Sequence, residues 1–494
     1  MFSEIVLRLI AFVLYLGVMI AIGLQYVKRN ASAGDFFLGG RNAGPWFTAL
    51  SAEASDMSGW LLMGLPGVAY VTGMKSAFWT AVGLVIGTYL NWLLIARRLR
   101  RYSAQCGNAI TIPEFLTNRF KDHSYVISRI AVVFILIFFT IYTASGFVAC
   151  AQLINSVYGL PYRTGLILGA AVIVLYTLLG GYLAVCATDF IQGTLMFIAL
   201  ITTLIIMMVS LGGLSNAVAQ VNAFGAQFLN PFVSDETDFG IMNIVSSLGW
   251  GLGYFGMPHI LVRFMAISDD KQVPLSRRIA MVWVTLSLVC AVIIGVFAKV
   301  YLHPALAQGA QETVIIETLK RMYPAFIGGV FLCAILAAAM STADSQLLVA
   351  ASALSEDFIG TILKKRPSDR QLLNISRLTV LGIAVIAFVV ALDEHRSIFG
   401  LVSYAWAGFG ATFGPLILLS LFWRGGTAKG AIAGIIAGGV VVIVWHQLSG
   451  GIFDIYEIIP GFAACLVCAV IVSALDRHKD AAMLAEFDAY REMI

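Results

Sequence analysis

Apolar segments long enough to cross a bilayer as helices recur from one end of the chain to the other. The first extends over about residues 5–27, and the hydrocarbon core requires a run of about 20 apolar residues. A chain of 494 residues that is 60% hydrophobic and only 12% charged is too apolar for a soluble fold of this size. The sequence therefore predicts an all-α integral membrane protein.

We expect about thirteen transmembrane helices. They are placed near 5–27, 45–72, 78–95, 125–157, 164–183, 190–211, 240–262, 279–301, 324–354, 378–392, 398–422, 431–446 and 453–475. With this count most of the 31 Lys and Arg residues, including those from Arg263 to Arg278, fall in loops on one side. That side should be cytoplasmic. The N-terminus is then outside and the C-terminus inside, in a multi-pass protein of the cell inner (plasma) membrane.

The second expected span contains a polar stretch, Ser51 to Trp60, that does not suit a lipid-facing helix. It holds Glu53, Asp56 and three serines, and an ionised Asp at the bilayer centre costs about 2.5–3.5 kcal/mol. Gly59 permits an unwound turn, whose freed carbonyls are tolerated only where they line a cavity or hold an ion. We interpret the stretch as the hinge of a broken helix and a cation site. A polar seam between two packed helices is the alternative.

The ninth expected span carries a second polar stretch, at 337–346. Four of its residues share one helical face: Ala338, Ser341, Thr342 and Ser345. Their hydroxyl and carbonyl oxygens suit a hard cation such as Na⁺. A single serine can instead bond the carbonyl four residues earlier.

The seventh expected span should be broken as well. Residues 249–258 contain four glycines and a proline, with Trp250 and Tyr254 on one face; close helix packing on glycine ridges is the alternative. Spans two and seven are five apart and run in opposite directions, as in an inverted five-plus-five repeat. In a single transmembrane domain (1–494), the repeats would occupy about 44–212 and 240–424, accessory helices 5–27 and 427–475, and a cytoplasmic tail 476–494.

These motifs resemble the sodium:solute symporter family over nearly the whole chain. The most specific runs lie at 54–67, 250–260, 340–342 and 405–410. The resemblance implies a leucine-transporter-type core and alternating access. It also implies Na⁺ as the coupling ion and L-proline as the solute, imported across the lipid bilayer. Symport of another small organic solute, or a membrane sensor built on the same fold, is the alternative.

The resemblance also implies site residues. The Na⁺ ligands would be the carbonyls of Ala54, Met57 and Ala338 and the hydroxyls of Ser341 and Thr342, with Asp56 as the essential acid beside them. The residues of the proline pocket would be Tyr142, Trp250, Tyr254 and Pro258, closed by Ser58 and Gly59. Arg41 would couple ion and solute movement at the cytoplasmic side. Asp189 would serve sodium release or a second ion, or else cap the N-terminus of the sixth span.

Two acids depart from the family pattern. Glu53 stands where well-known members carry a small residue, and Asp344 where they carry a serine. Asp344 should project toward the inner side of the Na⁺ site, in the same half as Asp189. Together with Ser345 these acids would form a second Na⁺ site or an exit path for the ion. Alternatively, Asp344 bonds a neighbouring backbone group or an inner-loop arginine.

Other classes of function are not expected. The sequence contains no evident nucleophile–base–orienter set and no metal-ligand cluster, so we do not expect an enzyme. Cys465 and Cys468 have the spacing of a redox motif but lie in a hydrophobic run, where cysteines pack as small apolar residues. The basic residues lie at span ends and indicate topology, not nucleic acid. No obligate protein partner is evident.

Overall fold

The structure is a computed structural model that describes residues 2–27, 38–179, 182–232, 239–359, 369–477 and 479–492. Across these ranges the chain is helical and contains no strand; one isolated bridge joins Ala43 to Ile267. Ten described helical segments are long and apolar enough to cross a membrane. The predicted all-α membrane fold is confirmed.

The ten segments have these bounds: α1 (Phe2–Val27), α5 to α6 (Lys75–Leu90, continued by Asn91–Ala96 and Arg97–Gln105), α8 (Val126–Tyr158), α10 (Tyr182–Ser210), α14 (Val273–Tyr301), α16 (Ala325–Ser352), α18 (Asp369–Val390), α19 (Ile398–Phe422), α20 (Ala428–Trp445) and α21 (Ile458–Leu475). The shorter helices include α7 (Ile112–Arg119), α9 (Tyr162–Leu179), α11 (Leu214–Asn222), α15 (Val314–Met322) and α22 (Ala481–Glu492).

Two further segments are broken helices. One comprises α3 (Pro45–Asp56), η2 (Trp60–Gly64) and α4 (Leu65–Thr72). The other comprises α12 (Ile241–Leu248), η5 (Gly249–Phe255) and α13 (Pro258–Ala266). These two segments and the short α9 coincide with the three remaining predicted crossings. The two broken segments are not continuous helices and α9 has only 18 residues, so the count of thirteen stays a prediction.

Local sequence explains both breaks. α3 ends at Asp56 because Met57 leaves helical geometry, with φ −82° and ψ 71°. In the other segment Met257 is extended, and Pro258 then starts α13. The glycine-packing interpretation also holds there, since a Cβ on Gly251 would lie 2.4 Å from the carbonyl oxygen of Gly83. The glycines both break the helix and allow α5 to approach it.

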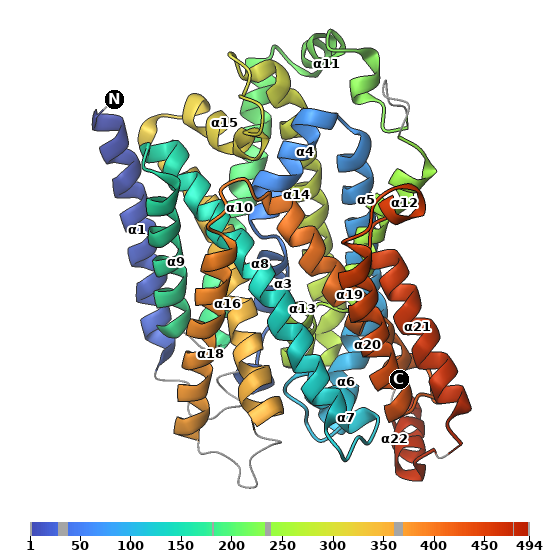
Figure 1. Cartoon of the computed structure of the whole chain (residues 1–494). Coiled ribbons are helices and arrows are strands. Elements are labelled where there is room, and N and C mark those ends of the chain that lie inside the picture. Colours follow the sequence, from blue (N-terminus) through green and yellow to red (C-terminus); the bar gives the residue numbers. More distant parts are fainter. Residues whose placement is uncertain are drawn as a thin grey trace.

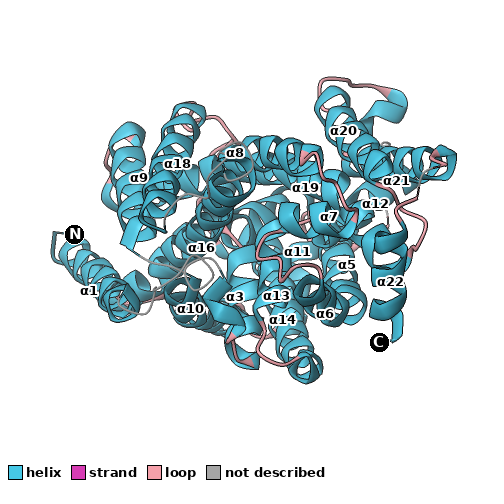
Figure 2. Cartoon of the chain, turned by 90° about the horizontal axis from the view of Figure 1, so that it is seen from below, coloured by secondary structure: helices cyan, strands magenta, loops and turns pink. Residues whose placement is uncertain are grey.

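The broken segments lie inside the bundle. Figure 2 shows α3 and α13 in the middle, with α1, α9 and α18 on the left and α20 and α21 on the right. Figure 1 shows α6, α7 and α22 together at the lower end, which we call the basic end because α6 carries four arginines. Other charged residues of the predicted inner loops, namely Lys28, Arg29, Lys364, Lys365 and Arg366, lie outside the described residues.

Two boundaries differ from those expected. The sixth span, predicted from about residue 190, begins at Tyr182 in α10. Asp189 therefore lies inside the helix, and the N-cap interpretation is wrong. The predicted tail contains a docked helix, α22, in which Tyr490 stacks on Tyr102 of α6 at 4.0 Å and Asp488 pairs with Arg424 at 2.7 Å. The tail thus ends packed against the basic end.

Candidate functional site

Asp56 lies at the break after α3 and is only 1% exposed. The Tyr254 hydroxyl, from η5, donates to its Oδ2 at 2.6 Å, and the Tyr142 hydroxyl, from α8, donates to its carbonyl oxygen at 3.2 Å. The other carboxylate oxygen, Oδ1, is buried without a hydrogen-bond partner among the described residues. The carboxylate therefore joins the two broken segments and keeps one acceptor free.

Oxygen atoms of α3 and α16 converge beside this break. The Ser341 hydroxyl donates to the carbonyl oxygen of Ala54 at 2.7 Å and lies 3.3 Å from that of Ala338. Next to it, the Thr342 hydroxyl is buried without a partner in the described part of the chain. Met57 is the residue at which α3 ends. Four of the five predicted Na⁺ groups thus lie on facing helices, and the orphaned oxygens fit a hard cation.

The other predicted solute residues also lie near the break. Trp250 is buried, with its ring centroid 5.7 Å from that of Trp60 and 5.0 Å from that of Phe399. The Ser58 hydroxyl lies 3.5 Å from that of Tyr142, and Gly59 packs against Ala149.

Further rings close this group. Tyr456 and Trp406 lie 5.5 and 6.3 Å from Trp250, centroid to centroid. Tyr254, which bonds Asp56, contacts Trp406 edge-on at 5.0 Å, and Pro258 begins α13 a turn later. Trp250 and Tyr254 thus lie in one aromatic cluster with Trp406. Tyr254 and Tyr142 both bond Asp56, so the cluster adjoins the break.

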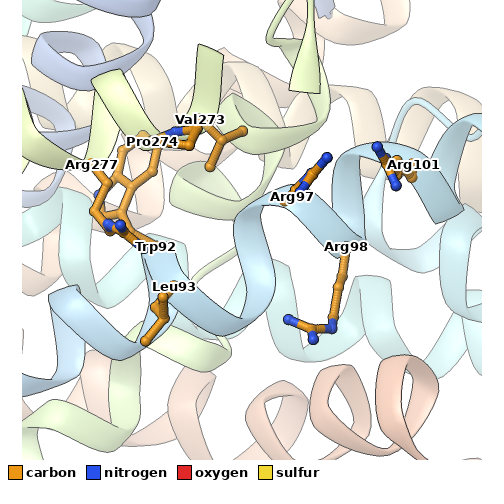
Figure 3. A pocket seen from close by; sticks show the side chains of 8 residues that line it. All are labelled: Trp92, Leu93, Arg97, Arg98, Arg101, Val273, Pro274 and Arg277. Atoms are coloured by element: carbon orange, nitrogen blue, oxygen red, sulfur yellow. The ribbon is translucent and has the colours of Figure 1, made fainter. Parts of the chain in front are cut away.

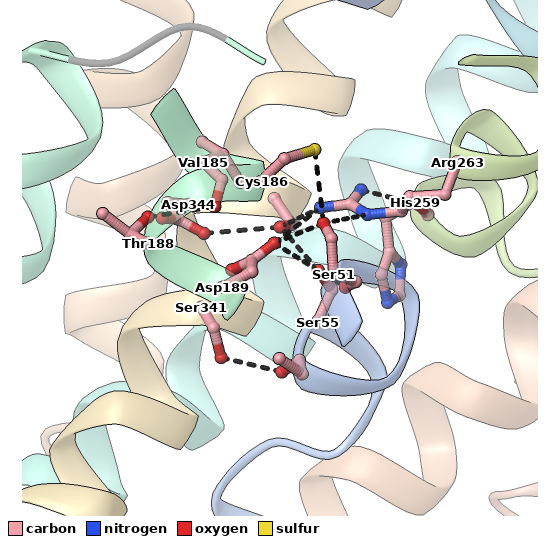
Figure 4. Close-up of polar contacts among 12 residues, drawn as sticks. Ser51, Ser55, Val185, Cys186, Thr188, Asp189, His259, Arg263, Ser341 and Asp344 are labelled. Atoms are coloured by element: carbon pink, nitrogen blue, oxygen red, sulfur yellow. Dashed lines mark hydrogen bonds and ion pairs between the residues drawn. The ribbon is translucent and has the colours of Figure 1, made fainter. Parts of the chain in front are cut away.

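A second polar cluster lies toward the basic end (Figure 4). Oδ2 of Asp189, on α10, accepts hydrogen bonds from Ser51 at 2.6 Å and Ser55 at 3.1 Å. The hydroxyls of Ser55 and Ser345 are 2.9 Å apart, and Ser345 donates to Asp344 Oδ1 at 3.3 Å. All five side chains are buried. Asp189, Asp344 and Ser345 therefore lie in one cluster, as expected. The cluster also includes two serines of α3.

Arg263 completes this cluster and was missed in the sequence analysis. It is 1% exposed on α13, so its assignment to an inner loop is wrong. One guanidinium nitrogen, Nη2, lies 3.3 Å from Asp189 Oδ2 and donates to Ser345 Oγ at 2.5 Å. Nε donates to Ser51 Oγ at 3.1 Å. The predicted alternative that Asp344 pairs with an inner-loop arginine is corrected in the same way. The arginine of its cluster is Arg263, which is buried on α13.

A signal for Arg263 was present in the sequence. It is flanked by Ile260-Leu261-Val262 and Phe264-Met265, and a basic residue inside an apolar run usually pairs with an acid inside the membrane. Asp189 and Asp344 both lacked an obvious partner. The carboxylate oxygens Asp189 Oδ1 and Asp344 Oδ2 have no hydrogen-bond partner among the described residues.

Arg41 lies at the basic end, away from both clusters. It donates to the carbonyl oxygens of Met265 at 2.5 Å and Ala109 at 2.8 Å, and to the side chains of Ser103 and Asn108. Burial and the nearby Arg100 charge lower the pKa of Arg41 to about 10. Beside it, Ala43 and Ile267 form the isolated bridge. Arg41 thus links the chain entering α3 to the end of α13.

Glu53, the other departure, is buried one turn before the break. Its Oε1 accepts a hydrogen bond from the indole of Trp92 at 3.2 Å, and its Oε2 has no partner among the residues described. The Trp92 ring also packs on Phe264 of α13, with centroids 4.5 Å apart. Glu53 therefore connects α3 to the helical stretch Asn91–Ala96 that joins α5 to α6.

Known proteins share this sequence and architecture. A model of the sodium:solute symporter family matches residues 36–438. The high-affinity proline transporter PutP of Bacillus subtilis (strain 168) is 45% identical over 476 residues, which cover 96% of this chain and 99% of that protein. The sodium/proline symporter of Escherichia coli (strain K12) is 44% identical over 490 residues, which cover 98% of this chain and 96% of that protein.

Solved structures agree on the fold. A Na⁺-coupled sialic acid symporter in a substrate-bound outward-open state has a TM-score of 0.80 at 19% identity, covering 96% of this chain and 99% of its own. MhsT in complex with L-phenylalanine has a TM-score of 0.57 at 15% identity, covering 88% and 99%. The fold is thus of the predicted leucine-transporter type.

Proposed function

The chain belongs to the sodium:solute symporter family, and from that premise we propose that it imports L-proline together with Na⁺ by alternating access. The observation that carries this proposal is identity above 40% over nearly the full length with proteins named as proline transporters and sodium/proline symporters. Na⁺ is the coupling ion of this family of transporters, which are not enzymes.

Na⁺ binds first, between α3 and α16. Its ligands are the Ala54, Met57 and Ala338 carbonyls and the Ser341 and Thr342 hydroxyls. The 2.7 Å approach of Ser341 to Ala54 supports this assignment, since an ion held there links the two helices. Asp56 balances the positive charge, and its hydrogen bond from Tyr254 carries the effect of the ion to η5.

Proline then binds beside η5. Trp250, Tyr254 and Tyr142 cover its ring, with Pro258 at the start of α13, while Ser58 and Gly59 close the pocket. The proline carboxylate is a suitable ligand for the positive end of a half-helix. The ion therefore prepares the solute pocket, because Tyr254 of that pocket bonds Asp56 beside the ion.

The ionic gradient suffices for accumulation. One charge moving through 100 mV supplies about 2.3 kcal/mol, and a tenfold Na⁺ gradient adds about 1.4 kcal/mol. With one ion per proline, these terms allow accumulation on the order of several hundredfold.

The inner cluster serves as the exit path of the ion, not as a second Na⁺ site. Arg263 supports this choice because its guanidinium already pairs with Asp189 and donates to Ser345. A second Na⁺ would have to bind beside this positive charge, which repels it. Asp344 then adds a polar group to the path, and one Na⁺ accompanies each proline.

The basic end faces the cytoplasm, with the N-terminus outside and the C-terminus inside, in the cell inner membrane. The arginines of α6 support this orientation. There Arg41 couples the two broken segments, since its contacts join the entry to α3 with the end of α13. The two repeats have the proposed bounds of about 44–212 and 240–424.

Uptake into proteoliposomes tests this function. Radiolabelled proline should accumulate only with an inward Na⁺ gradient, and unlabelled proline should compete better than other amino acids. Trp250→Ala should raise the KM for proline more than it raises the Na⁺ concentration for half-maximal uptake. Proline is not the solute if it is neither transported nor able to compete with the solute that the protein does transport. Na⁺-coupled symport of another solute would then remain the function.

A further inference from the structure

A cavity of about 270 Å³ opens at the basic end, between the α5–α6 segment and the start of α14 (Figure 3). Four arginines line it: Arg97, Arg98 and Arg101 on α6 and Arg277 on α14. Trp92 and Leu93 supply apolar walls. None of these residues has a role in the transport mechanism above.

The lining is rich in positive charge. Asp270 accepts a hydrogen bond from Arg97 at 2.8 Å and pairs with Arg101 at 2.7 Å. Arg98 and Arg277 form no ion pair with any residue that the structure describes; Arg277 lies over the Tyr89 ring at 5.5 Å. Arg98 points away from Arg97 and Arg101 (Figure 3) and lies over the Phe422 ring at 4.8 Å. The other three guanidinium groups are matched by one contacting carboxylate, which favours an anionic ligand with several oxygens, such as a phosphate.

The surroundings favour a phosphate that belongs to a lipid. Leu93, in the wall, is 39% exposed, and Leu275, Ile86 and Val282 on the same two segments are 45%, 51% and 59% exposed. Exposed apolar side chains on spanning helices face acyl chains. The arginines thus lie where this apolar surface ends, at the depth of the headgroups.

We propose that this cavity binds the phosphate of an anionic membrane phospholipid. The acyl chains would lie against the exposed apolar residues of α5 and α14, and the phosphate oxygens would accept hydrogen bonds from Arg97 and Arg277. Basic pockets between transmembrane helices at the cytoplasmic face are typical sites for such headgroups. The proposal does not depend on which solute is carried.

The cavity wall is connected to the transport site. Trp92 lines the cavity with its ring and donates its N–H to Glu53, three residues before Asp56. The same ring packs on Phe264 of α13. A bound headgroup therefore holds a tryptophan that contacts both broken segments, and lipid occupancy should stabilise their arrangement. Glu53 acquires a role here as the acceptor that links the lipid site to the hinge.

The test compares two double variants that lose the same charge. Arg97→Gln with Arg277→Gln alters the cavity, whereas Lys271→Gln with Arg278→Gln removes two exposed charges at the same end of the bundle but outside the lining. Thermal unfolding of detergent-purified full-length protein is followed while phosphatidylglycerol, phosphatidylcholine or inorganic phosphate is added. Proline uptake is then measured in phosphatidylethanolamine vesicles with increasing phosphatidylglycerol.

Phosphatidylglycerol should raise the Tm of the wild type and the control variant, and the cavity variant should require about tenfold more lipid. Uptake should rise with phosphatidylglycerol in the first two proteins and not in the cavity variant. An equal lipid response of all three proteins would overturn the proposal. An equal Tm rise with phosphatidylcholine would also overturn it. An equal Tm rise with inorganic phosphate would overturn the lipid assignment and show that the cavity binds the free anion. The single variant Arg277→Gln, which removes no ion pair of the described chain, gives the same comparison if the double variant unfolds.

Discussion

Two buried carboxylate clusters involve residues of α3, and they differ in how their charge is compensated. Asp56 receives a hydrogen bond from a neutral group, the Tyr254 hydroxyl, and no basic side chain pairs with it among the described residues. Asp189 accepts hydrogen bonds from Ser51 and Ser55, which precede Asp56 in α3, and it pairs with Arg263. One site lacks an internal cation, and the other contains one.

A buried carboxylate that stays ionised needs a nearby positive charge. At the inner cluster the chain supplies that charge itself. At the break it supplies only oxygen atoms, two of them orphaned, namely Asp56 Oδ1 and Thr342 Oγ1. This difference supports the proposed placement of Na⁺ at the break. Changes at the two sites should therefore have different consequences.

The largest effect is expected for Asp56→Asn. Asparagine keeps an acceptor for Tyr254 but removes the charge that compensates Na⁺, so Na⁺-stimulated proline uptake should fall at least about a hundredfold. Asp393→Asn, an exposed acid in a loop, is the control for insertion and expression. Normal Na⁺ dependence of the Asp56→Asn protein in uptake assays would show that the Na⁺ site does not lie at the break.

A large loss is also expected for Ser341→Ala with Thr342→Ala. Removing two oxygen ligands should raise the Na⁺ concentration for half-maximal uptake about 10–100-fold. Ser352→Ala is the matched control, since it removes a buried hydroxyl that bonds the Val349 carbonyl on the same helix. The ion site is misplaced if both proteins need the same Na⁺ concentration.

The third prediction concerns the inner pair. Arg263→Gln leaves Asp189 buried without its cation and should destabilise the protein by about 3–5 kcal/mol. Adding Asp189→Asn removes the uncompensated charge and should restore most of that stability, as measured by thermal unfolding in detergent. Additive destabilisation in the double variant would show that the two side chains do not compensate each other.

The smallest effect is expected for Asp344→Ser. Because Arg263 already pairs with Asp189, the change removes a polar group of the exit path and no ion ligand. Uptake should slow by at most about threefold, with unchanged Na⁺ dependence. A shift from two ions to one in this variant would instead make Asp344 a ligand.

The sequence predicted the break better than the inner cluster. Asp56 and Ser341 were found because polar residues inside apolar spans are costly and therefore indicate a function. Helical spacing also places Ser341 on the same face as Ala338. Arg263 was missed because counting charges by loop assigns an arginine near a span end to water. Its partner Asp189 is 74 residues away in the chain, and only the fold reveals the pair.

Two helix ends were missed for related reasons. Hydropathy identifies only the strongly apolar part of α10, whereas the helix starts at Tyr182. The polar residues Thr188 and Asp189 can lie inside the buried helix because both have hydrogen-bond partners there. α22 has its own pattern: Met483, Phe487 and Tyr490 are buried at helical spacing. That pattern is short and lies in a polar tail, where no apolar span draws attention to it.

The number of Na⁺ ions carried with each proline decides whether the inner cluster also binds an ion. The reversal potential of wild-type protein is measured in proteoliposomes with a tenfold proline gradient and equal Na⁺ on both sides. One Na⁺ per proline requires about 59 mV to stop net flux, and two require about 30 mV. A value near 59 mV agrees with one ion at the break and an inner cluster in which Arg263 pairs with Asp189. A value near 30 mV would contradict the account, because a second Na⁺ would then have to bind despite the guanidinium.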